Sequence, residues 1–169
     1  GEYKKTENQV EMVDDEGKSV AVIFATTPKW LTSKEMQDLM EWMREGMVEK
    51  KYHPLVIIAN FLVEFLKIHP FQDGNGRLSR ILTNLLMLQH GYEYVPYVSH
   101  EKLVEDNKAE YYVALRQSQK TFKTETEDIS AWLKFFLGIS LAQAKEAIAL
   151  LSKENVEKLL SPKQLLVWQ

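Results

Sequence analysis

The chain has 169 residues, which is enough for one sizeable hydrophobic core and too little for a second full domain. Its 45% hydrophobic and 27% charged residues, with only seven glycines and five prolines, exclude collagenous, low-complexity and disordered classes. The formal net charge of −3 disfavours a nucleic-acid-binding domain, and the lack of cysteine excludes disulfides, thiolate zinc sites and cysteine nucleophiles.

No membrane segment is expected. The N-terminus has no apolar run of the kind found in signal peptides, and the longest apolar stretch, Leu55 to Leu66, is broken by Asn60 and Glu64. Together with the lack of cysteine, this pattern fits a cytoplasmic protein.

The first thirty residues predict a β-hairpin. Val10 and Met12 alternate with polar residues, a turn cluster of acidic residues and glycine follows, and a second apolar run comes next. We place the two arms at about 9–13 and 19–24.

A helix is predicted from the region of Thr32 to Glu49. Thr32 and Glu35 have the spacing of a capping box, and Leu31 and Met36 have that of a hydrophobic staple. An apolar stripe recurs along this helix every three or four residues, which favours core packing over ligand binding. The stripe comprises Met36, Leu39, Met40, Met43 and Met47.

The segment from His53 to Ile68 is apolar on nearly every face and predicts the central helix of the core. The next helix is expected to end at His90, where Gly91 suits a left-handed terminating residue. Its apolar repeat is Leu78, Ile81, Leu82 and Leu85. Two more helices are predicted at about 107–121 and 128–151, so the expected fold is mostly α with one hairpin.

The two ends of the sequence suggest a longer natural protein. Ser161 and Pro162 form a strong helix start, although only the residues to Gln169 remain to follow it. Gly1 stands where an initiating methionine would be expected.

The chemistry is concentrated in one segment, which reads HPFQDGNGRLSR from His69 to Arg80. Gly74, Asn75 and Gly76 precede a predicted helix, so their backbone N–H groups can form an anion-binding nest at its positive end. Arg77 and Arg80 are three residues apart and are placed in the first turn of that helix, where the helix dipole disfavours cations. This arrangement predicts a polyanion, most simply phosphate.

Two further residues of this segment add reactive groups. Asp73 offers the carboxylate oxygen that Mg²⁺ prefers when it bridges phosphates, and His69 is the nearby side chain that can take a proton near neutral pH. Together these residues predict transfer of a phosphate-containing group to a hydroxyl.

Each residue alone has a simpler interpretation. A histidine before proline is commonly a capping or packing residue, and a Gly-Asn-Gly run or a lone aspartate is commonly a turn. Their combination within twelve positions favours the phosphate site. A Walker P-loop is excluded because no Gly-Lys-Ser/Thr ending follows, and scattered histidines without an HExxH pattern argue against zinc.

The segment from His69 to Arg80 resembles, position by position, the Fic motif His-Pro-Phe-x-(Asp/Glu)-Gly-Asn-Gly-Arg-x-x-Arg. The resemblance extends from Tyr3 through the hairpin to the Tyr111–Leu115 segment and on to Trp132 and Phe136. It implies an all-α, Fic-type helical bundle with an N-terminal β-hairpin flap. Fic proteins with an intact motif are mostly adenylyltransferases, which move AMP from ATP onto a Ser, Thr or Tyr hydroxyl of a target protein.

The resemblance also implies a role for each motif residue. His69 would take the proton from the target hydroxyl, and Asp73 would hold the Mg²⁺ that bridges the α- and β-phosphates of ATP. The anion hole would be formed by Gly74, Asn75 and Gly76, with Asn75 near the α-phosphate. Arg77 would meet the β-phosphate and Arg80 the γ-phosphate, while Phe71 would point inward and anchor the loop.

The hairpin would be the flap that registers a target peptide by strand addition; the alternative is an ordinary hairpin packed on the helices. The expected flap residues are Ser19, Val20, Ala21, Val22, Ile23, Phe24, Ala25 and Thr26. We expect a Fic domain over residues 1–150, with the hairpin at about 9–26 and the motif loop at 69–80. Residues 151–169 would be a helical extension that opens a truncated winged-helix domain.

Many Fic enzymes are inhibited by a helix with the motif (Ser/Thr)-x-x-x-Glu-(Gly/Asn), which neither Glu7-Asn8 nor Glu154-Asn155 completes. The inhibitory segment would then lie upstream, come from an antitoxin-like partner, or be absent. Nucleic acid would be bound only through a missing C-terminal domain, and a homodimer stays open. The alternatives to adenylyl transfer are transfer of phosphate or another nucleotide, and a non-enzymatic regulatory module.

Overall fold

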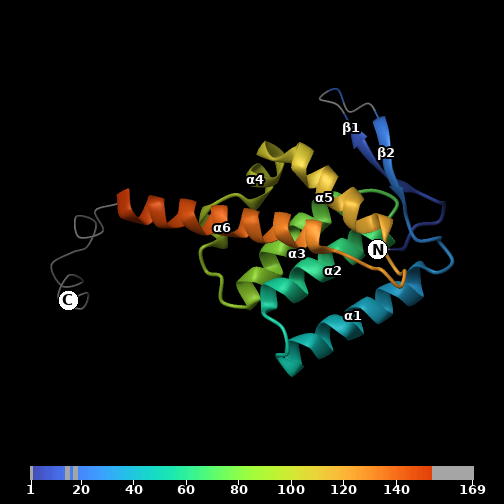
Figure 1. The fold of residues 1–169 in the computed structure, drawn as a ribbon, viewed down its shortest axis with the longest axis horizontal. Coiled ribbons are helices and arrows are strands. Elements are labelled where there is room, and N and C mark those ends of the chain that lie inside the picture. The colour runs from blue at the N-terminus through green and yellow to red at the C-terminus, as the bar shows by residue number, and fades with distance from the viewer. Residues whose placement is uncertain (1, 14–15, 17–18, 154–169) are drawn as a thin grey trace.

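The computed structural model describes residues 2–13, 16 and 19–153. These residues form a helical domain with one hairpin, which confirms the expected fold class. In chain order the elements are β1 (Gln9–Val13), β2 (Ser19–Ala25), α1 (Thr32–Glu49), α2 (Pro54–Ile68), α3 (Asn75–Gln89), the 3-10 helix η1 (Val95–Tyr97), α4 (His100–Asp106), α5 (Lys108–Lys120) and α6 (Ser130–Lys153). Figure 1 shows the hairpin at one end of the domain, next to α5, and α6 running across the domain.

The hairpin occupies the predicted arms. Strands β1 and β2 pair antiparallel, with Gln9 opposite Ala25 and Val13 opposite Ser19, and the register shifts twice along the ladder. Val10 is buried in the main core, and Ile23 and Phe24 pack against it. Since a lone two-stranded ribbon is marginal in water, these contacts with the helices hold the hairpin in place.

Helix α1 has the predicted bounds but not the predicted cap. Leu31 is the N-cap, without a side-chain hydrogen bond, and Thr32 is already helical. The Thr32 hydroxyl donates to the carbonyl of Pro28, and the Glu35 carboxylate accepts from the Thr27 hydroxyl at 2.5 Å and from Lys123 Nζ. The capping box was therefore a wrong prediction, because both side chains have partners elsewhere.

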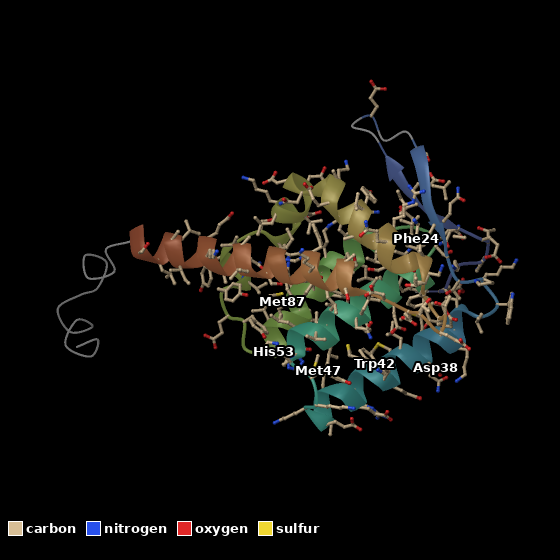
Figure 2. The ribbon with its side chains drawn as sticks, viewed as in Figure 1. Phe24, Asp38, Trp42, Met47, His53 and Met87 are labelled. Carbon is tan, nitrogen blue, oxygen red and sulfur yellow. The ribbon has the colours of Figure 1, made fainter. Side chains whose placement is uncertain are left out.

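The apolar stripe of α1 packs in the core with one exception. Met36 and Leu39 are buried, and Met43 and Met47 pack against the core, whereas the Met40 side chain is 48% exposed. Met40 lines an open groove between α1 and α3 together with Met43 and Met47. Figure 2 labels Met47 on α1 and the fully buried Met87 in the middle of the domain.

Helix α2 is the predicted centre of the core. It begins at Pro54, after an N-cap at His53 whose Nδ1 accepts from the Leu55 N–H. Most of its side chains are buried: Ile57, Ile58, Ala59, Phe61, Leu62, Val63, Phe65, Leu66 and Ile68. Each large aliphatic or aromatic side chain of this kind contributes about 1.5–3 kcal/mol on full burial, so α2 makes a large contribution to the core.

Helix α3 buries only part of the predicted apolar stripe: Leu78 and Leu82 pack against the core as predicted. Ile81 and Leu85 are exposed, whereas Ser79 and Thr83 are buried. The Ser79 hydroxyl donates to the Gly76 carbonyl, and the Thr83 hydroxyl donates to the Ser79 carbonyl, so both polar groups are satisfied within the helix. Gly91 follows the helix with φ 87°, as its left-handed role predicted.

The segment after α3 contains η1 and α4, which the sequence did not predict, followed by α5 and α6 close to their expected positions. Helix α6 contributes Trp132 and Phe136 to the main core and packs against α2, α4 and α5. The predicted extension at 151–169 lies outside the described residues beyond Lys153.

Among the described helices, α6 is the one long and apolar enough to cross a membrane: an 18-residue stretch within Ser130–Ser152 has a mean hydropathy of 1.3. Core helices of globular domains reach the same length and hydropathy. The first half of α6 has the contacts of a core helix, because Trp132 is 4% exposed and its Nε1 donates to the carbonyl of Ala59 at 2.7 Å.

Candidate active site

The catalytic candidate His69 lies at the end of the most buried helix. It is the C-cap of α2, with φ 50° and ψ 61°, and its N–H donates to the carbonyl of Phe65 at 2.9 Å. A left-handed conformation is uncommon for a residue with a Cβ, so the surroundings must hold it there. This turn points the chain out of the core and into the motif loop.

The His69 ring has a defined orientation. Its Nδ1 lies 3.2 Å from the carbonyl oxygen of Leu66, which can only accept a hydrogen bond. In the neutral ring the proton therefore resides on Nδ1, and Nε2 presents a lone pair. The pKa of His69 is lowered from 6.5, chiefly by burial and further by the positive charge of Lys4. The hydrogen bond to Leu66 and the negative charge of Asp73 act in the opposite direction and raise it. The ring is thus ready to accept a proton at neutral pH.

A buried lysine supports the loop from behind. Lys4 Nζ donates to Asn8 Oδ1, Thr26 Oγ1 and the carbonyl of Ile68 at 2.9, 3.0 and 2.9 Å. Asn8 Nδ2 donates onward to the carbonyls of His69 and Phe71 at 3.3 and 2.9 Å. These bonds join the segments that flank the hairpin to the backbone on both sides of Pro70.

Asn75 holds the loop together from inside. Its Oδ1 accepts from the Phe71 N–H at 2.9 Å, and its Nδ2 donates to the Phe71 carbonyl at 2.7 Å. The residue is 1% exposed. Phe71 packs against the core, with its ring centroid 6.0 Å from that of Tyr3, so the expected anchoring role of Phe71 is confirmed. Any contact of Asn75 with phosphate would involve its backbone N–H, since its side chain is engaged.

The start of α3 differs in two respects from the predicted nest. Gly74 is the N-cap with φ 82°, but Asn75 and Gly76 already belong to the helix. Because α3 begins at Asn75, Arg77 lies in its first turn and Arg80 in its second. The N–H groups at the start of α3 nevertheless point toward one region, which is favourable for an anion.

Asp73 lies at the exposed rim of the site. Its Oδ1 accepts from the Gly74 N–H at 2.6 Å, and its Oδ2 lies 3.3 Å from Nη2 of Arg77. The Asp73 side chain is 91% exposed. Among the described residues no group of three or more His, Asp or Glu side chains could hold a metal. A single free carboxylate beside a phosphate site still fits Mg²⁺, which commonly takes one or two carboxylates together with substrate phosphates and water.

Arg80 reaches back over the start of its own helix. Its Nε donates to Glu101 Oε1 of α4 at 3.0 Å. A Cβ placed on Gly76 would lie 3.7 Å from Nη1 of Arg80, and one on Gly74 would lie 3.7 Å from Nη2 of Arg77. Both guanidinium groups therefore lie close to the loop glycines.

One cavity of about 320 Å³ brings the predicted site residues together. Its lining includes all seven of them: His69, Asp73, Gly74, Asn75, Gly76, Arg77 and Arg80. The two arginines and the N–H groups at the start of α3 therefore line the same cavity as the His69 ring, which is the arrangement that binding of a phosphate ester requires.

The cavity also contains residues that sequence reasoning missed. Gln9, Val10 and Glu11 of β1 and Tyr111 and Tyr112 of α5 line it. Of the predicted flap residues 19–26, those whose side chains the structure describes do not line it, although Thr26 takes part in the Lys4 network. The Tyr111-Tyr112 pair was noted in the sequence, but its contribution depends on how α5 packs, which local patterns do not reveal.

Comparison with known proteins identifies relatives of this chain. The chain is 38% identical over 68 residues to a Fido domain-containing protein of Dictyostelium discoideum, covering 40% of this chain and 47% of that protein. It is 29% identical over 107 residues to a probable protein adenylyltransferase of Aquifex aeolicus, covering 63% of this chain and 30% of that protein. The chain thus spans less than half the length of these relatives.

The fold has a counterpart among solved structures. A Fic family protein from Desulfovibrio desulfuricans superposes with a TM-score of 0.72 at 26% identity, over 88% of this chain and 41% of that one. The profile of the Fic/DOC family matches residues 1–87, which include the whole motif from His69 to Arg80. Since this match spans more than half of the sequence, the chain belongs to the Fic/DOC family.

Proposed function

We propose that this domain is a protein adenylyltransferase, which transfers AMP from ATP to a Ser, Thr or Tyr hydroxyl of a target protein. The observation that carries the proposal is the convergence of the His69 ring, the start of α3 and two arginines on one cavity. Relatives named as protein adenylyltransferases support the same assignment.

In this proposal the nucleotide phosphates bind at the start of α3. The backbone N–H groups of Gly74, Asn75 and Gly76 would form the anion hole, and Arg77 and Arg80 would hold the β- and γ-phosphates. Asp73 would hold Mg²⁺, which when bound neutralises part of the phosphate charge. The Asp73 side chain is 91% exposed and makes one contact through each oxygen, so Mg²⁺ can reach its remaining lone pairs.

His69 would act as the general base. The target hydroxyl oxygen forms a bond to the α-phosphorus, the bond from that phosphorus to the α–β bridging oxygen breaks, and pyrophosphate leaves. The hydroxyl proton passes to Nε2 of His69, while Nδ1 keeps its bond to Leu66. No covalent enzyme intermediate is needed, so positioning and charge stabilisation contribute most of the rate.

The target protein would approach along the hairpin. Among the described residues β2 pairs with β1 and with no other strand, and Val22 is 52% exposed, which supports strand addition along the hairpin. A protein target, an inhibitory helix upstream or from a separate partner, a homodimer and a cytoplasmic location remain parts of the proposal.

The test is incubation of the protein with MgATP and a lysate, followed by mass spectrometry of the modified proteins. We expect an adenylyl group on a hydroxyl side chain with the wild type and none with His69→Ala. A phosphoryl group instead would indicate kinase-like transfer. Unmodified proteins in both reactions would favour a regulatory module without enzymatic activity.

A further inference from the structure

The two arginines of the site have different carboxylate partners. Arg77 is paired through its terminal nitrogen Nη2 with Asp73, four residues earlier in the same loop. Arg80 is paired through Nε with Glu101, which comes from the separate helix α4. Asp73 competes with phosphate for one N–H of the Arg77 terminal nitrogen, whereas the bond at Nε of Arg80 leaves all four N–H groups of its two terminal nitrogens available.

The backbone of Glu101 is held in place by the buried residues next to it in α4. The adjacent His100 is 4% exposed, and its ring lies 6.2 Å from that of Phe136 of α6. Leu103 and Val104 are also buried, so the beginning of α4 is fixed against the helical core. The Glu101 side chain itself is 66% exposed, but its backbone is a rigid base from which to hold Arg80.

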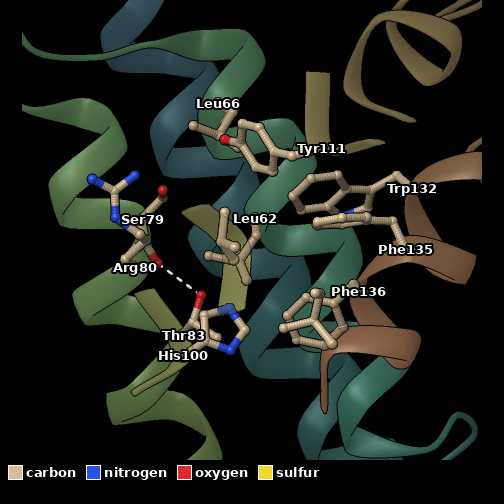
Figure 3. A pocket seen from close by; sticks show the side chains of 12 residues that line it. Leu62, Leu66, Ser79, Arg80, Thr83, His100, Tyr111, Trp132, Phe135 and Phe136 are labelled. Atoms are coloured by element: carbon tan, nitrogen blue, oxygen red, sulfur yellow. Dashed lines mark hydrogen bonds between the residues drawn. The ribbon is translucent and has the colours of Figure 1, made fainter. Parts of the chain in front are cut away.

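Figure 3 shows Arg80 and His100 around a small cavity of about 20 Å³, with Arg80 on the α3 side and the rings of Trp132 and Phe135 opposite. The Arg80 side chain is 31% exposed, so it is partly covered as it passes from this cavity to the active-site cavity. Without a partner at Nε, a long arginine side chain would lose rotamer entropy when it binds phosphate.

We propose that Glu101 is a positioning residue, which orients the Arg80 guanidinium so that its terminal nitrogens face the last phosphate of the bound nucleotide. The inference rests on the proposed function, because it requires a nucleoside triphosphate in the cavity. Glu101 acts through Arg80 and touches neither the nucleotide nor the target.

The charge of Glu101 opposes its orienting effect. A carboxylate near the site repels phosphate, so a purely electrostatic role would make both Glu101→Ala and Glu101→Gln bind ATP more tightly. An orienting role predicts different outcomes for the two variants. Alanine removes the acceptor for Nε, whereas the glutamine amide oxygen can still accept.

The experiment is calorimetric titration of MgATP and MgADP into wild type, Glu101→Ala, Glu101→Gln, Arg80→Ala and the Arg80→Ala/Glu101→Ala double variant. We expect Glu101→Ala to weaken ATP binding about two- to fivefold, the range for a partly exposed ion pair. Glu101→Gln should bind ATP at least as tightly as wild type. ADP binding should change little, and Glu101→Ala should have no effect in the Arg80→Ala background.

Glu105→Ala is the matched control, because Glu105 lies one turn later on α4, is similarly exposed and pairs with Lys108 at 3.3 Å. Unchanged or tighter ATP binding by Glu101→Ala overturns the inference, as does an equal loss for ADP or a loss that persists without Arg80. A wild-type protein that binds no ATP overturns the proposed function itself, so the two failures are distinguishable.

Discussion

The buried side of the motif loop and its exposed rim are held by different kinds of contact. At the inner end, His69 and Asn75 are fixed by hydrogen bonds to backbone groups of the loop and of α2. At the outer rim, Asp73 and Arg77 are exposed and contact mainly each other and the Gly74 N–H. The reacting group is thus positioned before any ligand arrives, whereas Asp73 and Arg77, assigned to metal and phosphate, have exposed partners that a ligand can replace.

This difference reflects burial. A buried polar group without a partner costs about 1–3 kcal/mol, so the inner residues are held by bonds that persist with or without ligand. An exposed ion pair contributes only about 0–1 kcal/mol and exchanges readily for a phosphate or metal contact. Substitutions at the inner end should therefore affect catalysis and stability, while those at the rim should affect ligand binding alone.

The largest effect is expected from His69→Ala. Loss of the general base should lower the rate of transfer by about 10²–10⁴-fold, while ATP affinity changes little because His69 is not assigned to the phosphates. Transfer assays and nucleotide titration measure the two quantities separately. His90→Ala, an exposed histidine at the end of α3, is the control, and transfer retained by His69→Ala would refute the assignment of the base.

Asn75→Ala should have the next largest effect. It removes both bonds to the Phe71 backbone and leaves these groups without partners, which should reduce the free energy of unfolding by about 1–3 kcal/mol. Urea denaturation measures the change. The control is Asn107→Ala, which loses a side-chain bond to the Leu103 carbonyl outside the loop and should leave transfer unchanged. Equal transfer by both variants would show that Asn75 does not hold the site.

A smaller effect is expected from Lys4→Met. The pKa of His69 is lowered chiefly by burial and further by the charge of Lys4, so wild-type activity should increase with pH through a midpoint below 6.5. Removing the Lys4 charge should raise the His69 pKa and move this midpoint upward. The pH profile of kcat/KM and the NMR titration of the imidazole both report it.

Lys5→Met provides the control for Lys4→Met. Lys5 is adjacent in the sequence but exposed, and it pairs with Glu2 at the surface. Its loss should leave the midpoint in place. A downward shift with Lys4→Met, or identical profiles for the two variants, would contradict the coupling between Lys4 and His69.

The smallest effect on stability is expected from Asp73→Asn. The ion pair with Arg77 joins exposed residues four apart, so its loss should change the free energy of unfolding by about 0.5 kcal/mol or less. The Mg²⁺ concentration needed for half-maximal transfer should nevertheless rise, because one carboxylate is removed. A large loss of stability, or an unchanged Mg²⁺ requirement, would indicate that Asp73 supports the loop structure, as Asn75 does, and does not bind the metal.

Much of the fold follows from local patterns in the sequence. The alternation in the hairpin, the fully apolar segment of α2 and the left-handed Gly91 are each determined by neighbouring residues. Helix α3 deviated because Ser79 and Thr83 are satisfied by their own helix and can be buried while Ile81 faces solvent. Leu78 and Leu82 pack against the core as the periodicity predicts, but periodicity alone does not identify the buried Ser79 and Thr83.

The motif residues were predictable as a set because they are adjacent in sequence and complementary in chemistry. Their supports were not, since the Lys4 bond to Ile68 spans 64 residues and the Arg80 bond to Glu101 spans 21. The same holds for Glu11, which reaches the cavity through the pairing of β1. Such partners are set by tertiary packing, which leaves no local signal in the sequence.

The most direct test of the site is NMR mapping of MgATP binding to the ¹⁵N-labelled wild-type protein. We expect the amide signals of Gly74, Gly76 and Arg77 and the imidazole signals of His69 to shift with a common dissociation constant. Shifts confined to the groove between α1 and α3, or no shifts at saturating nucleotide, would contradict the placement of the nucleotide beside His69.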